Sequence, residues 1–104
     1  MSSSLSRADL IKSLPPLYSQ ENSTDPILHK RLYAPNSEWA CYIAEGSAKP
    51  HDVILFGYFK GEISIWCRTS IRKLEQVLAA AGLKPAIDVQ FKAARFSEVF
   101  KTKR

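Results

Sequence analysis

The sequence predicts an α+β domain, in which an antiparallel sheet of about four to five strands carries one main amphipathic helix on a face, with short helices near both ends. Short runs rich in β-forming residues alternate with turn signals between residues 27 and 68. Apolar residues then recur at helical spacing from Ile71 to Ala81. A length of 104 residues suffices for one domain, residues 1–104, with its own core.

The first expected element is a short helix that starts at Ser6. Ser6 and Asp9 have the spacing of a capping box, in which each residue satisfies a backbone group of the other. Pro15 and Pro16 end the helix because neither ring can donate the helical hydrogen bond. We expect residues 1–5 to be disordered and residues 17–26 to form a loop.

Five segments have the composition or the alternation of strands. They are residues 27–33, 39–45, 53–60, 63–68 and 87–91. A turn is expected at 34–37, and a loop is expected from Gly46 to His51. The main helix is expected over residues 70–81, since Ser70 can cap it and Gly82 can end it. Phe96, Val99 and Phe100 indicate a short helix near the end of the sequence.

The hairpin around Gly61 has two alternative facings. A two-residue turn pairs even positions of its first strand with odd positions of its second. One face then carries Ile54, Phe56 and Tyr58 with Ile63, Ile65 and Cys67, and the other carries Val53, Leu55, Gly57 and Phe59 with Ser64, Trp66 and Arg68. A three-residue loop would exchange these partners.

The run from Trp39 to Ala44 contains no charged residue, although a half-buried strand alternates apolar with polar residues. We expect an interior strand with both faces covered. One side, with Trp39, would pack under the stripe of the main helix. The other, with Tyr42, would be covered by the first helix, the terminal segment or a second copy of the chain. A binding face for a partner is the alternative.

The net charge of +5 is concentrated near the end of the sequence. Residues 92–104 hold five basic residues against Glu98 alone, a net charge of +4, whereas residues 1–91 hold ten basic and nine acidic residues. Most of the domain is therefore close to neutral. The basic tail, residues 101–104, is either a solvated end or a weak binding arm.

Residues with catalytic potential are few and scattered. Cys41 and Cys67 fall in expected strands, which suggests two buried, reduced thiols; a cross-strand disulfide or a reactive thiol is the alternative. His29 and His51 have no neighbour at a metal-ligand interval. No glycine-rich phosphate loop or nucleophile elbow is present in the sequence. We therefore expect no enzymatic activity, no cofactor and no metal.

Several separated blocks of the sequence share a family pattern. These are LPPLYSQEN at residues 14–22, W-x-x-Y-x-x-E-G-S from Trp39 to Ser47, FGYFKG at 56–61, and a closing pattern of Leu74-Glu75, Gly82-Leu83, Asp88, Phe91-Lys92 and Phe96-Ser97-Glu98-Val99. Over residues 10–100 the chain resembles the bacterial family named domain of unknown function 2958, whose members often sit on plasmids and integrated mobile elements. Cys41 departs from a second aromatic residue of that pattern. The resemblance implies a mobile-element setting and no catalytic residue.

Two groups of residues are candidates for binding. Tyr18, Gln20, Glu21 and Glu45 lie in predicted loops or at a strand end, where binding groups often occur. The alternative is that the Tyr18 ring packs on the sheet while Gln20 and Glu21 satisfy loop backbone. On the expected sheet, Trp66 and Arg68 with Phe59 could stack on bases while Lys101, Lys103 and Arg104 neutralise phosphates. Tyr42 joins them as the residue on the second face of the uncharged strand.

The functional expectation is a small cytoplasmic accessory or modulator protein of a mobile genetic element that binds another protein. Weak single-stranded nucleic-acid binding is the alternative, and a homodimer is left open. A membrane partner is not expected, because no run approaches the ~20 apolar residues that a membrane span needs.

Overall fold

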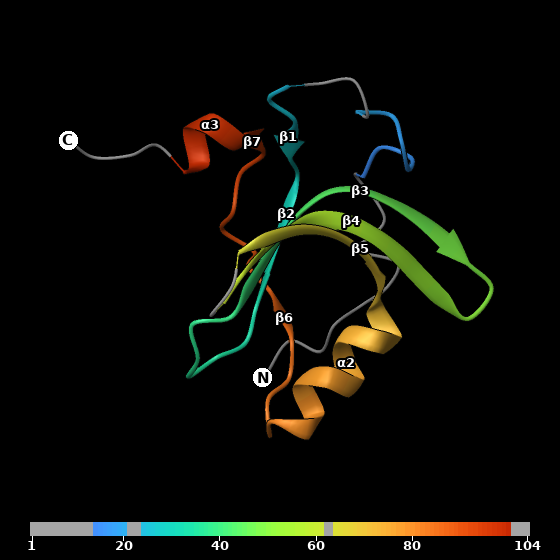
Figure 1. Cartoon of the computed structure of the whole chain (residues 1–104), viewed down its shortest axis with the longest axis vertical. Helices are drawn as coiled ribbons and strands as arrows, with labels where there is room; N and C mark the ends of the chain where they lie inside the picture. The colour runs from blue at the N-terminus through green and yellow to red at the C-terminus, as the bar shows by residue number, and fades with distance from the viewer. Residues whose placement is uncertain (1–13, 21–23, 62–63, 101–104) are drawn as a thin grey trace.

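A five-stranded antiparallel sheet with the strand order β5-β4-β3-β2-β6 forms the centre of the computed structural model (Figure 1), which describes residues 14–20, 24–61 and 64–100. A separate two-stranded sheet pairs β1 with β7. The elements in chain order are β1 Ile27–Leu28, β2 Lys30–Tyr33, β3 Ala40–Lys49, β4 Asp52–Lys60, β5 Ile65–Ser70, α2 Ile71–Ala80, β6 Ala86–Ile87, β7 Ala94–Arg95 and α3 Phe96–Val99. The antiparallel sheet of the predicted fold class is confirmed.

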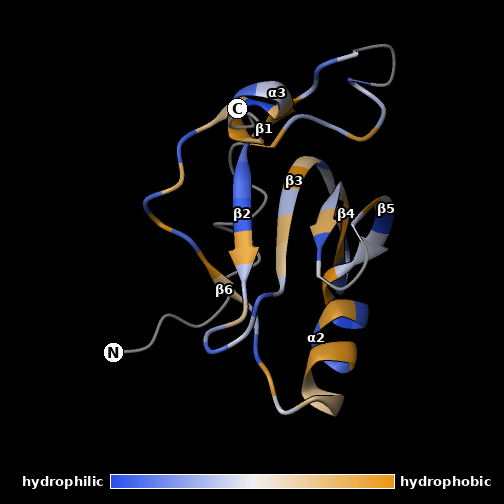
Figure 2. Cartoon of the chain, turned by 60° about the vertical axis from the view of Figure 1, so that its left-hand side comes forward, coloured by the Kyte–Doolittle hydropathy of each residue, from blue (hydrophilic) through white to orange (hydrophobic). Residues whose placement is uncertain are grey.

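The helix α2 packs on one face of the sheet, as the sequence predicts. Ser70 caps it, because its Oγ accepts a hydrogen bond from the Lys73 amide at 3.1 Å. Gly82 follows its last turn with φ +76°, a conformation that only glycine adopts readily. Hydrophobic and polar residues lie on opposite sides of α2 (Figure 2), and the buried side meets the core. The core cluster consists of Leu32, Cys41, Ile43, Val53, Leu55, Ile71 and Leu74.

Strand boundaries differ from the prediction, most clearly in three places. The first strand is broken at His29 into β1 and β2, and β1 leaves the main sheet to pair with β7. The loop expected from Gly46 to His51 is wrong, because β3 and β4 continue to a tight turn at residues 50–51. The strand expected over residues 87–91 ends at Ile87, as β6. The chain turns after it, since the amide of Phe91 donates to the Asp88 carbonyl at 3.2 Å.

The facing derived from a two-residue turn in the second hairpin is wrong. Tyr58 pairs with Trp66 and Phe59 pairs with Ile65, so even positions pair with even and odd with odd. An odd number of residues therefore separates the paired positions, as in the three-residue alternative. Phe56 and Tyr58 consequently share a face with Trp66 and Arg68.

The helix expected from Ser6, the disorder expected for residues 1–5 and the basic tail lie outside the described residues. The short helix expected near the end of the sequence is confirmed as α3. Within the described ranges, no helix is both long and apolar enough to cross a membrane.

Candidate functional site

The sheet face opposite α2 is built from aromatic and charged side chains. Register places Arg31, Tyr42, Tyr58 and Trp66 opposite one another across β2, β3, β4 and β5. Because directly opposed residues in a sheet point to the same side, these four form one continuous row. Tyr58 and Trp66 meet edge to face, with ring centroids 5.4 Å apart.

The C-terminal segment covers the middle of this face. The ring of Phe100 lies 4.8 Å from Tyr42 and 5.0 Å from Tyr58, measured between centroids. Phe91 also contacts Tyr42, at 5.8 Å. On the core side of the same strands, Trp39 packs against Phe59 and the core cluster. The expectation that the uncharged strand is covered on both faces is confirmed, and the terminal segment provides the second cover.

A β-bulge in β3 decides what stands beside the aromatic row. Ile43 pairs with Gly57, but Glu45 pairs with Phe56, so Ala44 is an extra residue in β3. Without the bulge, Glu45 would lie on the core face with Ile43, since side chains alternate along a strand. The bulge instead turns Glu45 to the face of Phe56.

The buried carboxylate of Glu45 holds the loop at residues 18–20. Its Oε1 accepts the Tyr18 amide at 2.7 Å and its Oε2 accepts the Gln20 amide at 2.8 Å. Glu45 is only 3% exposed, so these charge-assisted bonds replace the water it has lost. Tyr18 has φ +70°, an uncommon conformation for a residue with a side chain, and it directs its ring away from the core with 56% exposure.

The side chain of Gln20 fastens the same loop to two strands. Its Nε2 donates to the carbonyls of Ile27 and Ala44, at 3.0 and 3.1 Å, and its Oε1 accepts the Ile27 amide at 2.7 Å. The alternative in which Gln20 satisfies backbone groups is therefore the one observed. Gln20 shapes the site and has little hydrogen-bonding capacity left for a ligand.

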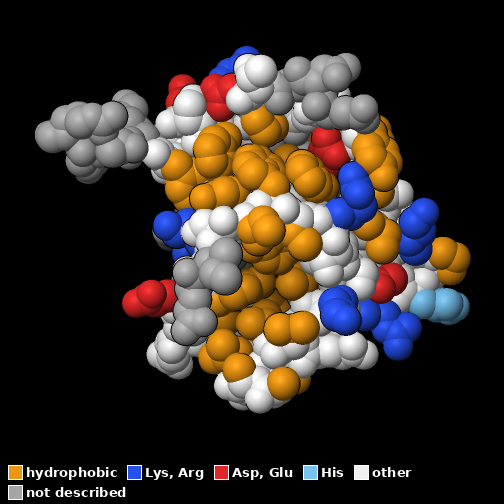
Figure 3. Space-filling view, in the orientation of Figure 1, with side chains coloured by type: hydrophobic (Ala, Val, Ile, Leu, Met, Phe, Trp, Pro, Cys, Tyr) orange, Lys and Arg blue, Asp and Glu red, His pale blue; other side chains and the backbone are white. Residues whose placement is uncertain are grey.

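These residues surround a pocket of about 470 Å³. Five of the candidate binding residues, Tyr18, Gln20, Glu45, Trp66 and Arg68, line it together with Phe56. Hydrophobic side chains gather across this part of the surface, between α3 and the loop that precedes β1 (Figure 3). Pockets with apolar walls and a few fixed polar groups are typical of binding sites.

Arg68 stands at the pocket with its guanidinium stacked on aromatic rings. Its Cζ lies 4.6 Å from the centroid of Tyr18 and 5.7 Å from that of Phe56. Phe56 in turn stacks on Trp66 at 5.4 Å, with an interplanar angle of 19°. Among the described residues, Arg68 forms no ion pair, so its positive charge is available to an anionic ligand.

Short contacts between distant segments hold α3 beside the pocket. Asp25 accepts hydrogen bonds from the Ser97 amide at 2.9 Å and the Ser97 hydroxyl at 2.6 Å. The Phe96 amide also donates to the Pro26 carbonyl at 2.8 Å. The Ser97 hydroxyl, followed by the Ser97 amide, lowers the pKa of Asp25. The resulting docking brings the ring of Phe96 to the pocket wall, 5.2 Å from Trp66.

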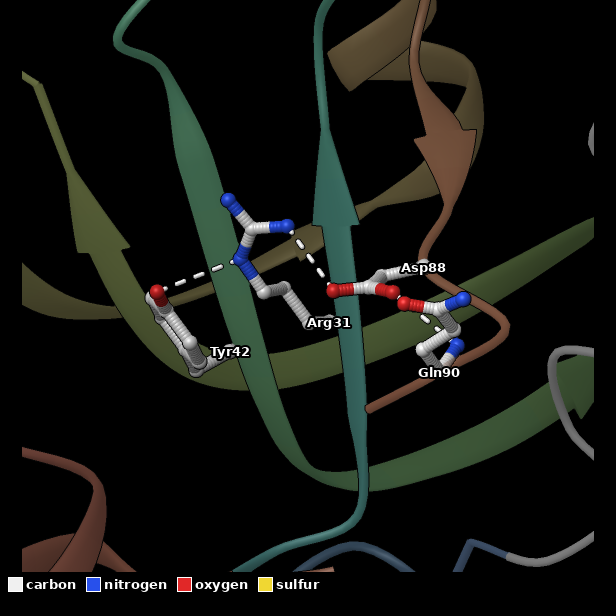
Figure 4. Close-up of polar contacts among 4 residues, drawn as sticks. All are labelled: Arg31, Tyr42, Asp88 and Gln90. Carbon is white, nitrogen blue, oxygen red and sulfur yellow. Dashed lines mark hydrogen bonds and ion pairs between the residues drawn. The ribbon is translucent and has the colours of Figure 1, made fainter. Parts of the chain in front are cut away.

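Tyr42 belongs to a neighbouring polar cluster and does not line the pocket. Its hydroxyl accepts from Arg31 Nε at 3.2 Å, and Arg31 Nη1 donates to Asp88 at 3.0 Å (Figure 4). Partial burial alone would lower the pKa of Arg31, but the bonds to Tyr42 and Asp88 outweigh it and the pKa is raised. Asp88 also accepts the Gln90 amide. This cluster pins the segment after β6 to the sheet.

The remaining expected binding residues either lie on the other face of the sheet or fall outside the described residues. Phe59 lies on the face opposite Trp66 and Arg68, where it pairs with Ile65, so the expected three-residue stacking surface does not form. Glu21, Lys101, Lys103 and Arg104 fall outside the described residues.

The cysteines and histidines do not come together in a site. Cys41 is buried, and burial followed by the charge of Cys67 raises the pKa of its thiol. Cys67 is exposed on the edge strand β5, so the expectation that both thiols are buried is wrong for it. Burial and then Lys30 lower the pKa of His29. In the described part of the chain, no three His, Cys, Asp or Glu residues are grouped as a metal site requires.

Phe56, Phe96, Thr24 and Pro26 line the pocket but were not singled out from the sequence. A signal existed for Phe56, because the three-residue loop alternative places it beside Arg68. No local signal marks the other three, and Phe96 is held at the pocket by contacts between distant segments, Asp25 with Ser97 and Pro26 with Phe96. No family model, curated protein or solved structure matches the chain, so the fold and the site stand on the residues themselves.

Proposed function

We propose that this chain is a non-enzymatic binding protein that captures another protein at the pocket between the loop at residues 18–20, β5 and α3. The observation that supports this most directly is the guanidinium of Arg68, which stacks beside Tyr18 and Phe56 and has no ion-pair partner among the described residues. Arginine and aromatic residues are the types most enriched where protein interfaces gain their affinity.

The polar groups of the pocket favour recognition over chemistry. Glu45 is occupied by two backbone amides and Gln20 by three backbone groups, so both act as supports. A rigid support allows the exposed ring of Tyr18 to offer a preorganised surface.

The resemblance over residues 10–100 supports the setting of this role, an accessory or modulator of a mobile genetic element acting in the cytoplasm. The sequence blocks that carry the resemblance include Tyr18, Gln20 and Glu45, three residues that build the pocket.

Filling the pocket with a larger side chain of the chain itself tests the proposal. Thr24 is exposed at the pocket wall, so Thr24→Trp should occupy the space without removing a packed ring. Proteins captured by the tagged parent chain would be identified by mass spectrometry and purified, and their binding measured by calorimetry. We expect Thr24→Trp to weaken that binding at least about tenfold.

Val89→Trp is the matched control, because Val89 is 85% exposed and does not line the pocket. Thermal melts of both variants establish that they fold. Equal binding by Thr24→Trp and the parent chain would refute the pocket as the capture site.

Single-stranded nucleic acid is the second candidate. The exposed ring of Tyr18 and the stacked guanidinium of Arg68 favour it, because sequence-tolerant nucleic-acid binding uses such pairs. Against it, α3 and its flanking residues cover much of the aromatic row, and Phe59 lies on the other face.

A further inference from the structure

The strand β5 forms one edge of the five-stranded sheet, and this edge borders the pocket. Its inner side pairs with β4. On its outer side, no other part of residues 14–20, 24–61 or 64–100 forms a backbone hydrogen bond with residues 65–70. An edge strand of this kind offers unpaired amides and carbonyls to an extended segment of another chain.

The side chains of β5 give an added strand two kinds of contact. Trp66 and Arg68 face the pocket, whereas Ile65 and Cys67 face the opposite side and are exposed. Residues directly opposite one another on paired strands have Cβ atoms about 4.5–5.5 Å apart. A strand beside β5 would therefore place alternate side chains against Trp66 and Arg68.

The positive charge beside β5 indicates which kind of segment would pair with this strand. Arg68 has no ion-pair partner among the described residues, and the exposed Arg72 and Lys73 follow at the start of α2. Lys and Arg side chains gather on the side of the molecule where α2 begins (Figure 3). Two copies of this chain would bring two positive edges together, which disfavours self-pairing. A segment with carboxylate side chains is complementary.

We propose that an extended acidic segment of a partner protein adds to β5 as an antiparallel sixth strand. In this orientation a carboxylate lies opposite Arg68 and, two residues later, an aromatic side chain lies opposite Trp66 at the pocket mouth. The guanidinium stacked on Tyr18 and Phe56 keeps its in-plane N–H groups for the carboxylate. This inference rests on the proposed function and names the chemistry of its partner.

A selection from random displayed peptides against the full chain tests the recognition rule. We expect enriched peptides to carry Asp or Glu two positions before an aromatic residue. The best peptide, made synthetically, should bind Arg68→Glu at least about tenfold more weakly than the parent chain. Lys84→Glu, with the same change of charge at an exposed position beyond α2, should change binding far less. Replacing the peptide's acid by Lys should restore binding to Arg68→Glu.

Amide hydrogen exchange separates this inference from the proposed function. Protection of β5 amides by the peptide, together with a change in Trp66 fluorescence, supports both. A Trp66 response without β5 protection overturns strand addition and leaves the pocket as the binding site. Peptides that lack an acidic preference, equal losses in Arg68→Glu and Lys84→Glu, or a dimer formed through β5 in light scattering would also overturn the inference. Selected peptides that leave both β5 and Trp66 unaffected refute the proposed function as well.

Discussion

Glu45 is buried, and its carboxylate accepts hydrogen bonds from two backbone amides. Replacing it by Ala leaves the Tyr18 and Gln20 amides without their acceptor. Losing hydrogen bonds to a charged group costs ~1.5–3 kcal/mol, so Glu45→Ala should lower the free energy of unfolding by about that amount.

Urea unfolding measures the effect, with Glu38→Ala as the control because Glu38 is exposed. A midpoint for Glu45→Ala equal to that of Glu38→Ala would show that the loop does not depend on this carboxylate.

Trp39 and Tyr42 lie on opposite faces of the sheet, and both are packed. Trp39 contacts Phe59 and the core, while Tyr42 contacts Phe91 and Phe100. Truncating a large aromatic core residue costs ~3–5 kcal/mol, so Trp39→Ala and Tyr42→Ala should both lower the melting temperature sharply.

Tyr42→Phe is the matched variant, because it removes only the hydroxyl that accepts from Arg31. Its expected loss is smaller, ~1 kcal/mol. If Tyr42→Ala melts like the parent chain, the terminal segment does not cover this face in solution, and the face becomes available to a partner.

At the scale of the element, β3 and β4 approach one another closely at Gly57, beside the bulge. A Cβ added to Gly57 would lie 2.3 Å from the Tyr42 carbonyl oxygen, a backbone atom that cannot move aside alone. Overpacking costs ~1–3 kcal/mol and occasionally more, so Gly57→Ala should destabilise the chain by at least that range.

Gly61→Ala is a control within the same hairpin, since a Cβ there would find its nearest atom 4.0 Å away. Thermal or urea unfolding compares the two. Equal stability of Gly57→Ala and Gly61→Ala would contradict the register of β3 and β4 at the bulge.

The docking of α3 should weaken in acid. The pKa of Asp25 lies below its ordinary value of 3.8, so its contribution to stability is present above that value and is lost as the pH falls through the lowered folded pKa. Protonation removes the charge that accepts from Ser97. The parent chain should therefore lose more thermal stability between pH 5 and acid conditions than Asp25→Asn does.

Melting curves across this pH range check the expectation, and Glu38→Gln is the control for the loss of one exposed carboxylate. Identical pH dependence in the parent chain and Asp25→Asn would show that Asp25 does not control the docking of α3.

Patterns within one segment of the sequence predicted the elements that depend on contacts within that segment. The cap at Ser70 and the apolar stripe of α2 lie within one segment, so spacing sufficed to predict them. The covered strand was also readable, because a strand packed on both faces has no polar alternation. The bulge at Ala44 was not readable, since an extra residue in a strand depends on its pairing with β4. The site followed the same division: Glu45 and Arg68 were found, whereas Phe96 reaches the pocket through tertiary contacts alone.

At the scale of the whole molecule, the location of charge limits binding to nucleic acid. Residues 1–91 hold ten basic and nine acidic residues, so they neutralise few phosphates in total. We expect binding to single-stranded DNA or RNA to be weak and to be largely lost when Lys101, Lys103 and Arg104 are replaced by Gln. Titrations at two salt concentrations measure it.

Replacing only these three basic residues by Gln is a fairer test than truncation. Truncation after residue 91 would also remove Phe96 and Phe100 from the aromatic face. Tight binding that survives the Gln substitutions would place the nucleic-acid site on the folded domain and reverse the order of the two proposed functions.

The hydrogen bonds between Asp25 and Ser97 complete the pocket wall, so the pocket forms only late in the synthesis of the chain. During synthesis, the ribosome makes residues 18–68 well before Phe96, yet Phe96 forms part of the pocket wall. Chains emerge at ~5–20 residues per second, so for seconds a nascent chain can carry Trp66 and Tyr58 without the ring that covers them. A partner would meet the complete pocket only after the last aromatic residues have been made. If the proposed function holds, capture would be confined to chains that have been translated at least through α3.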